Sequence, residues 1–130
     1  MKELIEQALE KKKWAVVGAS GNAERFGYKI LKHLDRLGYE VYPVNPNYDQ
    51  IATHKCYPTV GDIPGGVDVI NVVVNPKLSK AMLEEGDFSE LSALWFQPGS
   101  YNDETIELAK QKNPNVIHGH CVLVEAPPNY

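Results

Sequence analysis

Cysteine and clustered positive charge are both scarce in this sequence. Only Cys56 and Cys121 occur among 130 residues, whereas a small secreted domain held together by disulfides usually carries more. No run of Lys or Arg is longer than Lys11–Lys13, and the formal net charge is −4, so the basic stripe of a nucleic-acid-binding surface is missing. No apolar run is long enough to span a membrane, and the N-terminal segment lacks the apolar core of a signal peptide. We therefore expect a cytoplasmic protein that binds neither nucleic acid nor membrane.

The rest of the composition is typical of a globular protein. Hydrophobic residues make up 43% of the chain and charged residues 23%, which is an ordinary balance. The length fits one domain, spanning residues 1–130, with a core of its own. Short apolar runs alternate with amphipathic stretches, a pattern typical of βαβ units and a parallel sheet. The sequence therefore predicts an α/β fold.

The periodicity predicts five strands and about four helices. Gly38 stands where a helix ends, Pro76 suits a first helical turn, and Asp103 is expected to cap the last helix. Pro43 cannot donate to a strand ladder, so its strand is expected to be either irregular or near an edge. Residues 45–65 form a polar, proline-bearing crossover with at most a short helix near 59–63. The expected strands are 14–17, 41–44, 67–74, 93–96 and 116–117, and the expected helices are a leading one within 1–12, one over 26–37, one from Pro76 and one from Asp103.

The carboxyl ends of these strands carry the candidate site, because ligands of an open parallel sheet bind beyond those ends. The ends of the first four strands each carry Gly, Pro, Asn or Ser, and none of these four ends in Asp, Glu or His. Such residues suit backbone and amide contacts with a ligand better than acid–base catalysis. We therefore expect no catalytic residue and no enzyme activity. The four ends are Gly18-Ala19-Ser20-Gly21, Asn45-Pro46-Asn47, Asn75-Pro76 and Gln97-Pro98-Gly99-Ser100.

The loop after the first strand is the strongest sign of a ligand. Gly18 permits a sharp turn, and Gly21 and Gly27 remove side chains where a diphosphate could approach. Free amides at the start of the next helix would face the anion, aided by the helix dipole. Arg25 is placed to add a charge-assisted hydrogen bond to a phosphate. The loop thus predicts a phosphate site.

The same loop departs from the nicotinamide fingerprint. Gly-x-Gly-x-x-Gly requires glycines where this chain has Ser20 and Ala23. The acidic residue expected after the second strand, which holds the ribose hydroxyls, is replaced by Asn45. These departures argue against NAD without excluding it.

Several motifs, in order over residues 12–125, resemble the stand-alone CoA-binding domain family. That family is similar to the N-terminal domain of the succinyl-CoA synthetase α subunit. The resemblance implies a single Rossmann-like domain, with a five-stranded, mostly parallel sheet and helices on both faces. The motifs are Val16–Ser20, Gly27-Tyr28, Gly38–Pro46, Ile63-Pro64 with Val67-Asp68, Trp95–Gly99 and Cys121.

The resemblance also implies a coenzyme A site built from four strand ends. It implies binding of CoA or acyl-CoA without ligase chemistry, because the phosphorylated histidine of the synthetase belongs to a second domain. Around the phosphates would lie Gly18, Ala19, Ser20, Arg25, Phe26 and Gly27; near the adenosine end Asn45, Pro46 and Asn47; along the ligand Val73, Asn75 and Pro76; and on the pantetheine side Gln97 and Gly99.

Other interpretations stay open from the sequence. One is an NAD(H)-binding redox-sensing module, and another is a nucleotide-binding subunit of a separate CoA-ligase-type enzyme, so that a protein partner or a homo-oligomer fits as well. His118, His120 and Cys121 match no compact zinc pattern, and we expect no metal. Cys121 is either a buried structural cysteine or a partner for the CoA thiol in a mixed disulfide. His54 and Lys55 are either solvated or close to the 3′-phosphate.

Overall fold

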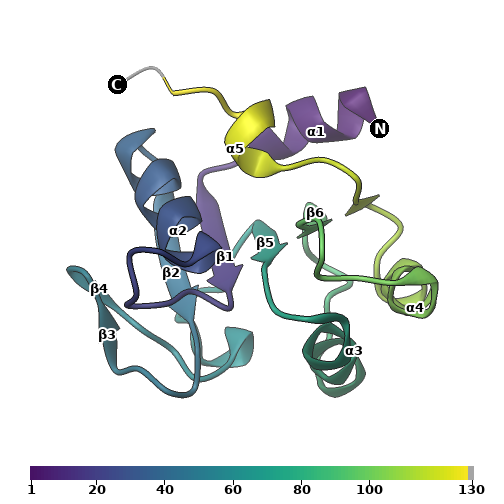
Figure 1. Ribbon diagram of the computed structural model, residues 1–130. Coiled ribbons are helices and arrows are strands. Elements are labelled where there is room, and N and C mark those ends of the chain that lie inside the picture. Colours follow the sequence, from purple (N-terminus) through teal and green to yellow (C-terminus); the bar gives the residue numbers. More distant parts are fainter. Residues whose placement is uncertain (129–130) are drawn as a thin grey trace.

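Five parallel strands form the centre of the structure, a computed structural model that describes residues 1–128 (Figure 1). The strands lie in the order β2-β1-β5-β6-β7, and each neighbouring pair is parallel. The five-stranded sheet predicted from the sequence is therefore confirmed, and it is parallel throughout. The strands are β1 (Lys13–Val17), β2 (Glu40–Val44), β5 (Val69–Val72), β6 (Ala93–Phe96) and β7 (Val116–Ile117).

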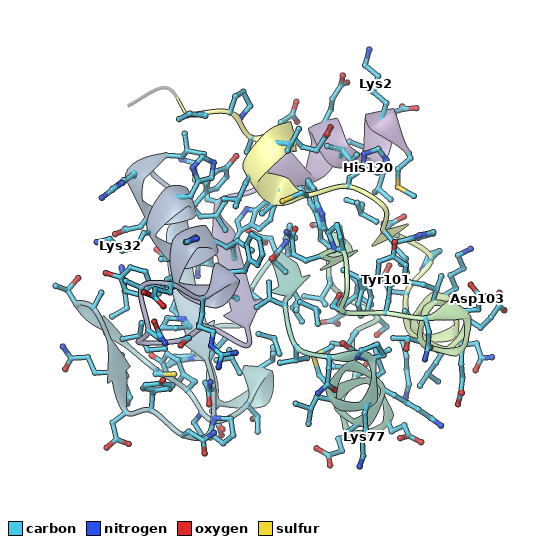
Figure 2. All side chains as sticks on the ribbon, viewed as in Figure 1. Lys2, Lys32, Lys77, Tyr101, Asp103 and His120 are labelled. Atoms are coloured by element: carbon cyan, nitrogen blue, oxygen red, sulfur yellow. The ribbon has the colours of Figure 1, made fainter. Side chains whose placement is uncertain are left out.

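Helices cover both faces of this sheet, as in a Rossmann-like fold. On one face pack α1 (Lys2–Leu9), α2 (Phe26–Arg36) and α5 (Val122–Glu125), and their buried residues share a core with Trp14 and Trp95. On the other face pack α3 (Pro76–Glu85) and α4 (Asp103–Lys112), in a core with Val17 and Ile70. Figure 2 shows side chains filling the space between the sheet and these helices.

The strand sequences explain the two cores. Successive side chains of a strand point to opposite faces, so Trp14 and Val16 enter one core while Ala15 and Val17 enter the other. Because both faces are covered, the strands are continuous apolar runs rather than alternating ones. Trp14 and Trp95 are fully buried, with ring centroids 5.9 Å apart.

The strand order fixes where a ligand can enter. The chain passes from β1 outward to β2, then returns past β1 to β5 on its other side. The order therefore reverses between β1 and β5, and the crevice outside their carboxyl ends is the expected ligand position.

The edge position of Pro43 is confirmed, because it lies in β2, at one end of the sheet. At this edge, the missing N–H of Pro43 removes no hydrogen bond between strands of the sheet. On the outer side its carbonyl accepts a hydrogen bond from the backbone N–H of Tyr57, at 3.0 Å. The crossover after β2 thus partly shields this edge.

Some element boundaries differ from those predicted. The leading helix ends at Leu9, and the chain then turns into β1, where the indole of Trp14 donates to the carbonyl of Lys11 at 2.9 Å. The predicted strand 67–74 is reduced to Val69–Val72. The cap of α4 is Asn102 rather than Asp103; its side-chain oxygen accepts from the N–H of Thr105 at 2.9 Å.

The crossover between β2 and β5 contains more structure than the sequence indicated. A small hairpin of β3 (Gln50–Ile51) and β4 (His54–Lys55) turns through Ala52, whose φ is 54°. The one-turn 3-10 helix η1 (Val60–Asp62) lies where the short helix was predicted. The hairpin and α5 were not predicted, because segments of two to four residues carry too little periodicity.

We predict that Leu34→Ala lowers the free energy of unfolding by about 2–5 kcal/mol. Leu34 is fully buried between α2 and the sheet, so its loss leaves a cavity. Denaturant unfolding measures the change. Val124→Ala is the matched control because Val124 is 71% exposed, and it should change stability by less than about 0.5 kcal/mol. Equal effects of the two substitutions would contradict the packing described here.

Candidate functional site

Two glycines bring the start of α2 against the end of β1. A side chain at Gly27 would overlap the carbonyl oxygen of Gly18, so the helix approaches the strand as only glycine allows. Gly18 has a φ of 97°, and a Cβ there would lie 2.8 Å from Val74 Cγ1. Both positions exclude any larger residue. The first turn of α2 therefore lies directly beside the switch point, the place between β1 and β5 where the strand order reverses.

The N-terminus of α2 offers donors to an anion. The loop before it satisfies part of its own backbone: the N–H of Asn22 donates to Ser20 Oγ and the N–H of Arg25 to the carbonyl of Asn22, both at 3.0 Å. Among residues 1–128, no group accepts from the N–H of Phe26 or Gly27. The first turn carries no acidic side chain, so free amides and the helix dipole favour a negative ligand.

Two side chains of this segment are exposed. Arg25, the N-cap of α2, makes no capping hydrogen bond with its side chain, and its guanidinium is available to a ligand phosphate. Phe26 is 65% exposed, and the ammonium of Lys29 lies 5.7 Å from its ring centroid. The segment therefore adds positive charge beside the free amides.

Asn45 joins the loops after β1 and β2. Its side-chain amide donates to the carbonyl of Ala19 at 2.9 Å, and its side-chain oxygen accepts from the N–H of Asn47 at 2.9 Å. A carboxylate could not donate to Ala19. The amide at this position, where a nicotinamide site has an acidic residue, thus has a structural role in the fold.

The loop after β5 lies directly behind Gly18. Val73 packs into the core on the α2 side, and a Cβ at Gly18 would lie 2.9 Å from its Cγ2 atom. Asn75 caps α3, because its side-chain oxygen accepts from the N–H of Leu78 at 2.9 Å, and Pro76 opens the helix as predicted. The loops after β1 and β5 therefore meet at the switch point.

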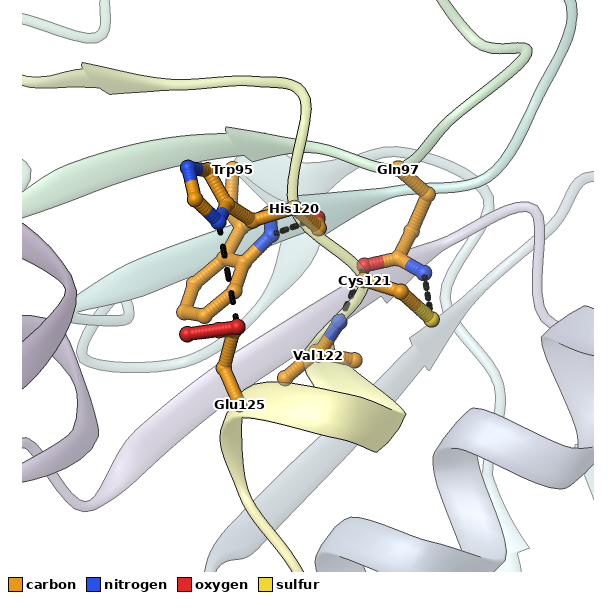
Figure 3. A network of polar contacts seen from close by, with 6 residues as sticks. All are labelled: Trp95, Gln97, His120, Cys121, Val122 and Glu125. Atoms are coloured by element: carbon orange, nitrogen blue, oxygen red, sulfur yellow. Dashed lines mark hydrogen bonds and ion pairs between the residues drawn. The ribbon is translucent and has the colours of Figure 1, made fainter. Parts of the chain in front are cut away.

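Gln97, after β6, belongs to a buried polar network rather than to an open surface (Figure 3). Its side-chain oxygen accepts from the N–H of Val122 at 2.9 Å and from the amide of Asn71 at 3.2 Å. Its amide donates to Cys121 Sγ at 3.2 Å. Gln97 thus fastens the start of α5 to the end of β6. Gly99, with a φ of 91°, has open space where a side chain would begin.

The two cysteines differ in their surroundings. Cys121 is half-buried, and its sulfur accepts a hydrogen bond from the side-chain amide of Gln97. These surroundings are compatible both with a structural cysteine and with a thiol close to a ligand. Cys56 is buried, and its thiol donates to the carbonyl of Asn45 at 3.4 Å. Burial raises the pKa of Cys56, which disfavours the reactive thiolate.

Three of the histidines, His54, His118 and His120, contact other side chains. In the described part of the chain, no group of three or more His, Cys, Asp or Glu side chains is arranged to bind a metal ion. His118 packs against the ring of Tyr101 at 5.3 Å, and His120 lies 3.7 Å from the carboxylate of Glu125. His54 pairs with Asp35 at 3.2 Å.

A large cleft lies on the α3 face of the sheet. Its volume is about 1020 Å³. In a doubly wound fold a crossover helix would cover this position, but between β2 and β5 the chain forms only the β3–β4 hairpin and η1. The cleft is lined by Val17, Gly18, Val44, Asn45, Pro46, Asn47, Pro58 to Gly61, Ile63, Gly65 to Val67, Ile70, Val74, Leu78, Ala81, Met82, Glu85 to Phe88, Glu90 and Leu91.

The two ends of the cleft differ in chemistry. At the carboxyl ends of the strands, Gly18, Asn45–Asn47 and the start of α3 surround it, and no charged residue lines it there. At the amino ends, where α3 finishes and the chain enters β6, its charged residues are Glu85, Asp87 and Glu90. Most cleft residues were not predicted as site residues. The weak helical periodicity of residues 45–65 was the available signal, because a missing helix leaves a sheet face open.

The structure brings together most of the predicted site residues. Those of 18–27, 45–47 and 73–76 surround the switch point, and Gly18 and Asn45–Asn47 also line the cleft. Gln97 and Gly99 do not line it. The side-chain NH2 groups of Asn45 and Gln97 donate within the protein, whereas Asn75 is engaged through its oxygen, so free amide donors come from the backbone and from the NH2 group of Asn75.

Comparisons with known proteins agree on one family. The family described as "CoA binding domain" matches residues 12–127. An uncharacterized protein of Bacillus subtilis, YneT, is 30% identical over 124 residues, covering 95% of this chain and 90% of YneT. A solved structure, a hypothetical protein from Pyrococcus horikoshii, superposes with a TM-score of 0.87 at 36% identity, covering 96% of this chain and 89% of that one.

Longer enzymes share the same region. An ADP-forming acetate–CoA ligase of Methanocaldococcus jannaschii is 32% identical over 116 residues, which cover 83% of this chain but 16% of the ligase. The chain therefore corresponds to a small part of that enzyme. Within residues 1–128, no helix is both long and apolar enough to cross a membrane.

We predict that Gly27→Ala destabilises the fold by more than about 2 kcal/mol, since the added methyl group would meet the Gly18 carbonyl and force α2 away from β1. Denaturant unfolding tests this. Gly61→Ala is the control, because a Cβ there would lie 3.7 Å from Thr59 Oγ1, an ordinary contact. If Gly27→Ala were as stable as the control, the close approach of helix and strand would be wrong.

Proposed function

The chain belongs to the CoA-binding domain family, and we propose that it binds coenzyme A or an acyl-CoA without catalysing a reaction on it. The observation that carries the proposal is the N-terminus of α2. Two amides there have no acceptor among residues 1–128, Arg25 stands beside them, and the missing side chains of Gly18 and Gly27 let this turn lie against the end of β1.

The diphosphate of CoA would lie against this N-terminus. The amides of Phe26 and Gly27 would donate to its oxygens, and the Arg25 guanidinium would add charge-assisted hydrogen bonds. Glycine at position 27 keeps these amides beside the end of β1, because any side chain there would meet the Gly18 carbonyl.

The adenosine end would enter the carboxyl end of the cleft. Val74 and Leu78 supply apolar surface on one side, and Asn45, Pro46 and Asn47 form the other. No carboxylate lines this end, so the 3′-phosphate would meet no like charge there. In the opposite direction, the pantetheine arm would pass the loop after β6, where the backbone at Gly99 is open.

The side chains present support binding without turnover. The side-chain NH2 groups of Asn45 and Gln97 are hydrogen-bonded within the protein, and none of β1, β2, β5 and β6 ends in Asp, Glu or His. A general acid or base would need such a group within reach of the thioester. Because the related ligase has about six times the aligned length, its chemistry would require parts that this segment does not contain.

A second candidate is a nucleotide-binding subunit that serves a separate CoA ligase. The alignment with part of an acetate–CoA ligase favours it. This role also requires CoA binding, so it adds a partner to the proposed function rather than replacing it.

We predict that the protein binds CoA more tightly than NAD, and that Arg25→Ala weakens CoA binding by about tenfold, or about 1.4 kcal/mol. Calorimetric titration of both ligands measures this. Lys110→Ala removes one positive charge from the exposed surface of α4 and should leave the affinity unchanged. Tighter binding of NAD would overturn the proposed function, and an unaffected Arg25→Ala variant would overturn the phosphate position.

We also predict that acetyl-CoA incubated with stoichiometric protein releases thiol no faster than in buffer. The ends of β1, β2, β5 and β6 supply no nucleophile together with a base. A colorimetric thiol assay follows the release. Cys121→Ser serves as the comparison, because Cys121 is the half-buried thiol beside Gln97. Fast release by the natural protein that this substitution abolishes would show that the protein is catalytic.

A further inference from the structure

The amino end of the cleft is separate from the proposed CoA site. α3 begins at the carboxyl ends of the strands and finishes at their amino ends, so Leu78 lies near the CoA site and Glu85 far from it. Between them the cleft continues along α3, bordered on its other side by η1 and the segment that enters β5. Figure 1 shows α3 on the same side of the sheet as α4, well apart from α2.

The walls of the amino end of the cleft are apolar, and some of their side chains are only partly covered by the protein. Ile63 and Ile70 form a buried floor, while Val60, Val67 and Met82 are only half-buried. Half-buried aliphatic side chains that face a common cleft gain free energy when a partner removes them from water. The surface is therefore suited to an apolar face of another molecule.

The charged residues that line this end are all negative, and the positive charge beside it is the ammonium of Lys13, 3.7 Å from the position of a Cβ at Gly65. Glu85, Asp87 and Glu90 line it and are exposed, and no Lys, Arg or His is among the residues that line the cleft. Such a rim repels the phosphates of CoA and attracts cations. The occupant must then combine apolar surface with positive charge.

We propose that this end of the cleft binds an amphipathic α-helix of a partner protein, with aliphatic residues on the buried face and Lys or Arg on its flanks. The helix would occupy the position that a crossover helix fills in other doubly wound folds, packed between α3 and η1. α3 has 10 residues, so a helix of comparable length, about 15 Å, matches the groove. This inference does not depend on CoA binding.

A second copy of this chain fits less well. A two-fold contact through this surface would place two acidic rims together, and the chain has a net charge of −4. Like charges brought together at an interface oppose association. The complementary surface must come from a different molecule.

The test uses a labelled synthetic peptide of Leu and Lys in a helical pattern, about 14 residues long, and the same peptide with Glu in place of Lys. Fluorescence anisotropy should show binding of the Lys peptide at least about tenfold tighter than that of the Glu peptide. The variant Glu85→Lys/Glu90→Lys should lose this preference. Glu84→Lys/Glu107→Lys, which changes the net charge equally at exposed positions outside the cleft, should keep it.

Met82→Gln tests the apolar wall. It puts an amide of similar length into the groove and should weaken binding of the Lys peptide, while circular dichroism shows that the fold is retained. No binding of the Lys peptide by the natural protein, or an equal loss in both charge variants, would overturn the proposal.

Two other occupants are also distinguished. If sedimentation shows a dimer that Glu85→Lys/Glu90→Lys dissociates, the groove holds a second copy and the proposal is wrong. If the same variant binds CoA about tenfold more tightly while the control does not, the groove belongs to the CoA site, and the proposal is again wrong. Unchanged CoA affinity together with a lost peptide preference supports it.

Discussion

The contact between Gly18 and Gly27 is the constraint on which the site depends. Without side chains at these positions, the first turn of α2 lies against the end of β1, where the strand order reverses. The free amides of Phe26 and Gly27 are then held by the sheet rather than by a mobile loop. The position of Asn45 follows from the same arrangement, because its amide reaches back to Ala19, between the two glycines. A change at either glycine would therefore alter both loops at once.

The second determining feature is the shortened crossover between β2 and β5. A full helix there would cover the α3 face of the sheet, but the hairpin and η1 cover only part of it. The resulting cleft reaches from the switch point to the amino ends of the strands. One departure from the usual fold thus provides room for the adenosine end of a nucleotide and also leaves an apolar groove beyond it.

Much of the fold could be predicted, because it depends on local patterns. Strand runs such as Trp14–Val17 and Ala93–Phe96 are apolar on both faces, which marks buried parallel strands, and Pro43 correctly indicated an edge. The contacts of Gln97 and Asn45 could not be predicted, since they join residues 24 to 26 positions apart in the sequence. An amide at a strand end looks the same in a sequence whether it faces a ligand or the protein. The cleft was missed for a related reason, because it arises where a helix is absent.

The distribution of charge reconciles an acidic protein with an anionic ligand. The net charge is −4, yet the phosphate site would be governed by groups within a few ångströms: two amides, a helix dipole and Arg25. The carboxylates of the cleft stand at the far end of α3, and its 10 residues span about 15 Å. The Debye length at physiological ionic strength is about 8 Å, so repulsion from Glu85 and Glu90 is largely screened at that distance. A negative ligand can therefore be attracted to the start of α2 and a positive one to the amino end of the cleft, and the net charge of the chain determines neither interaction.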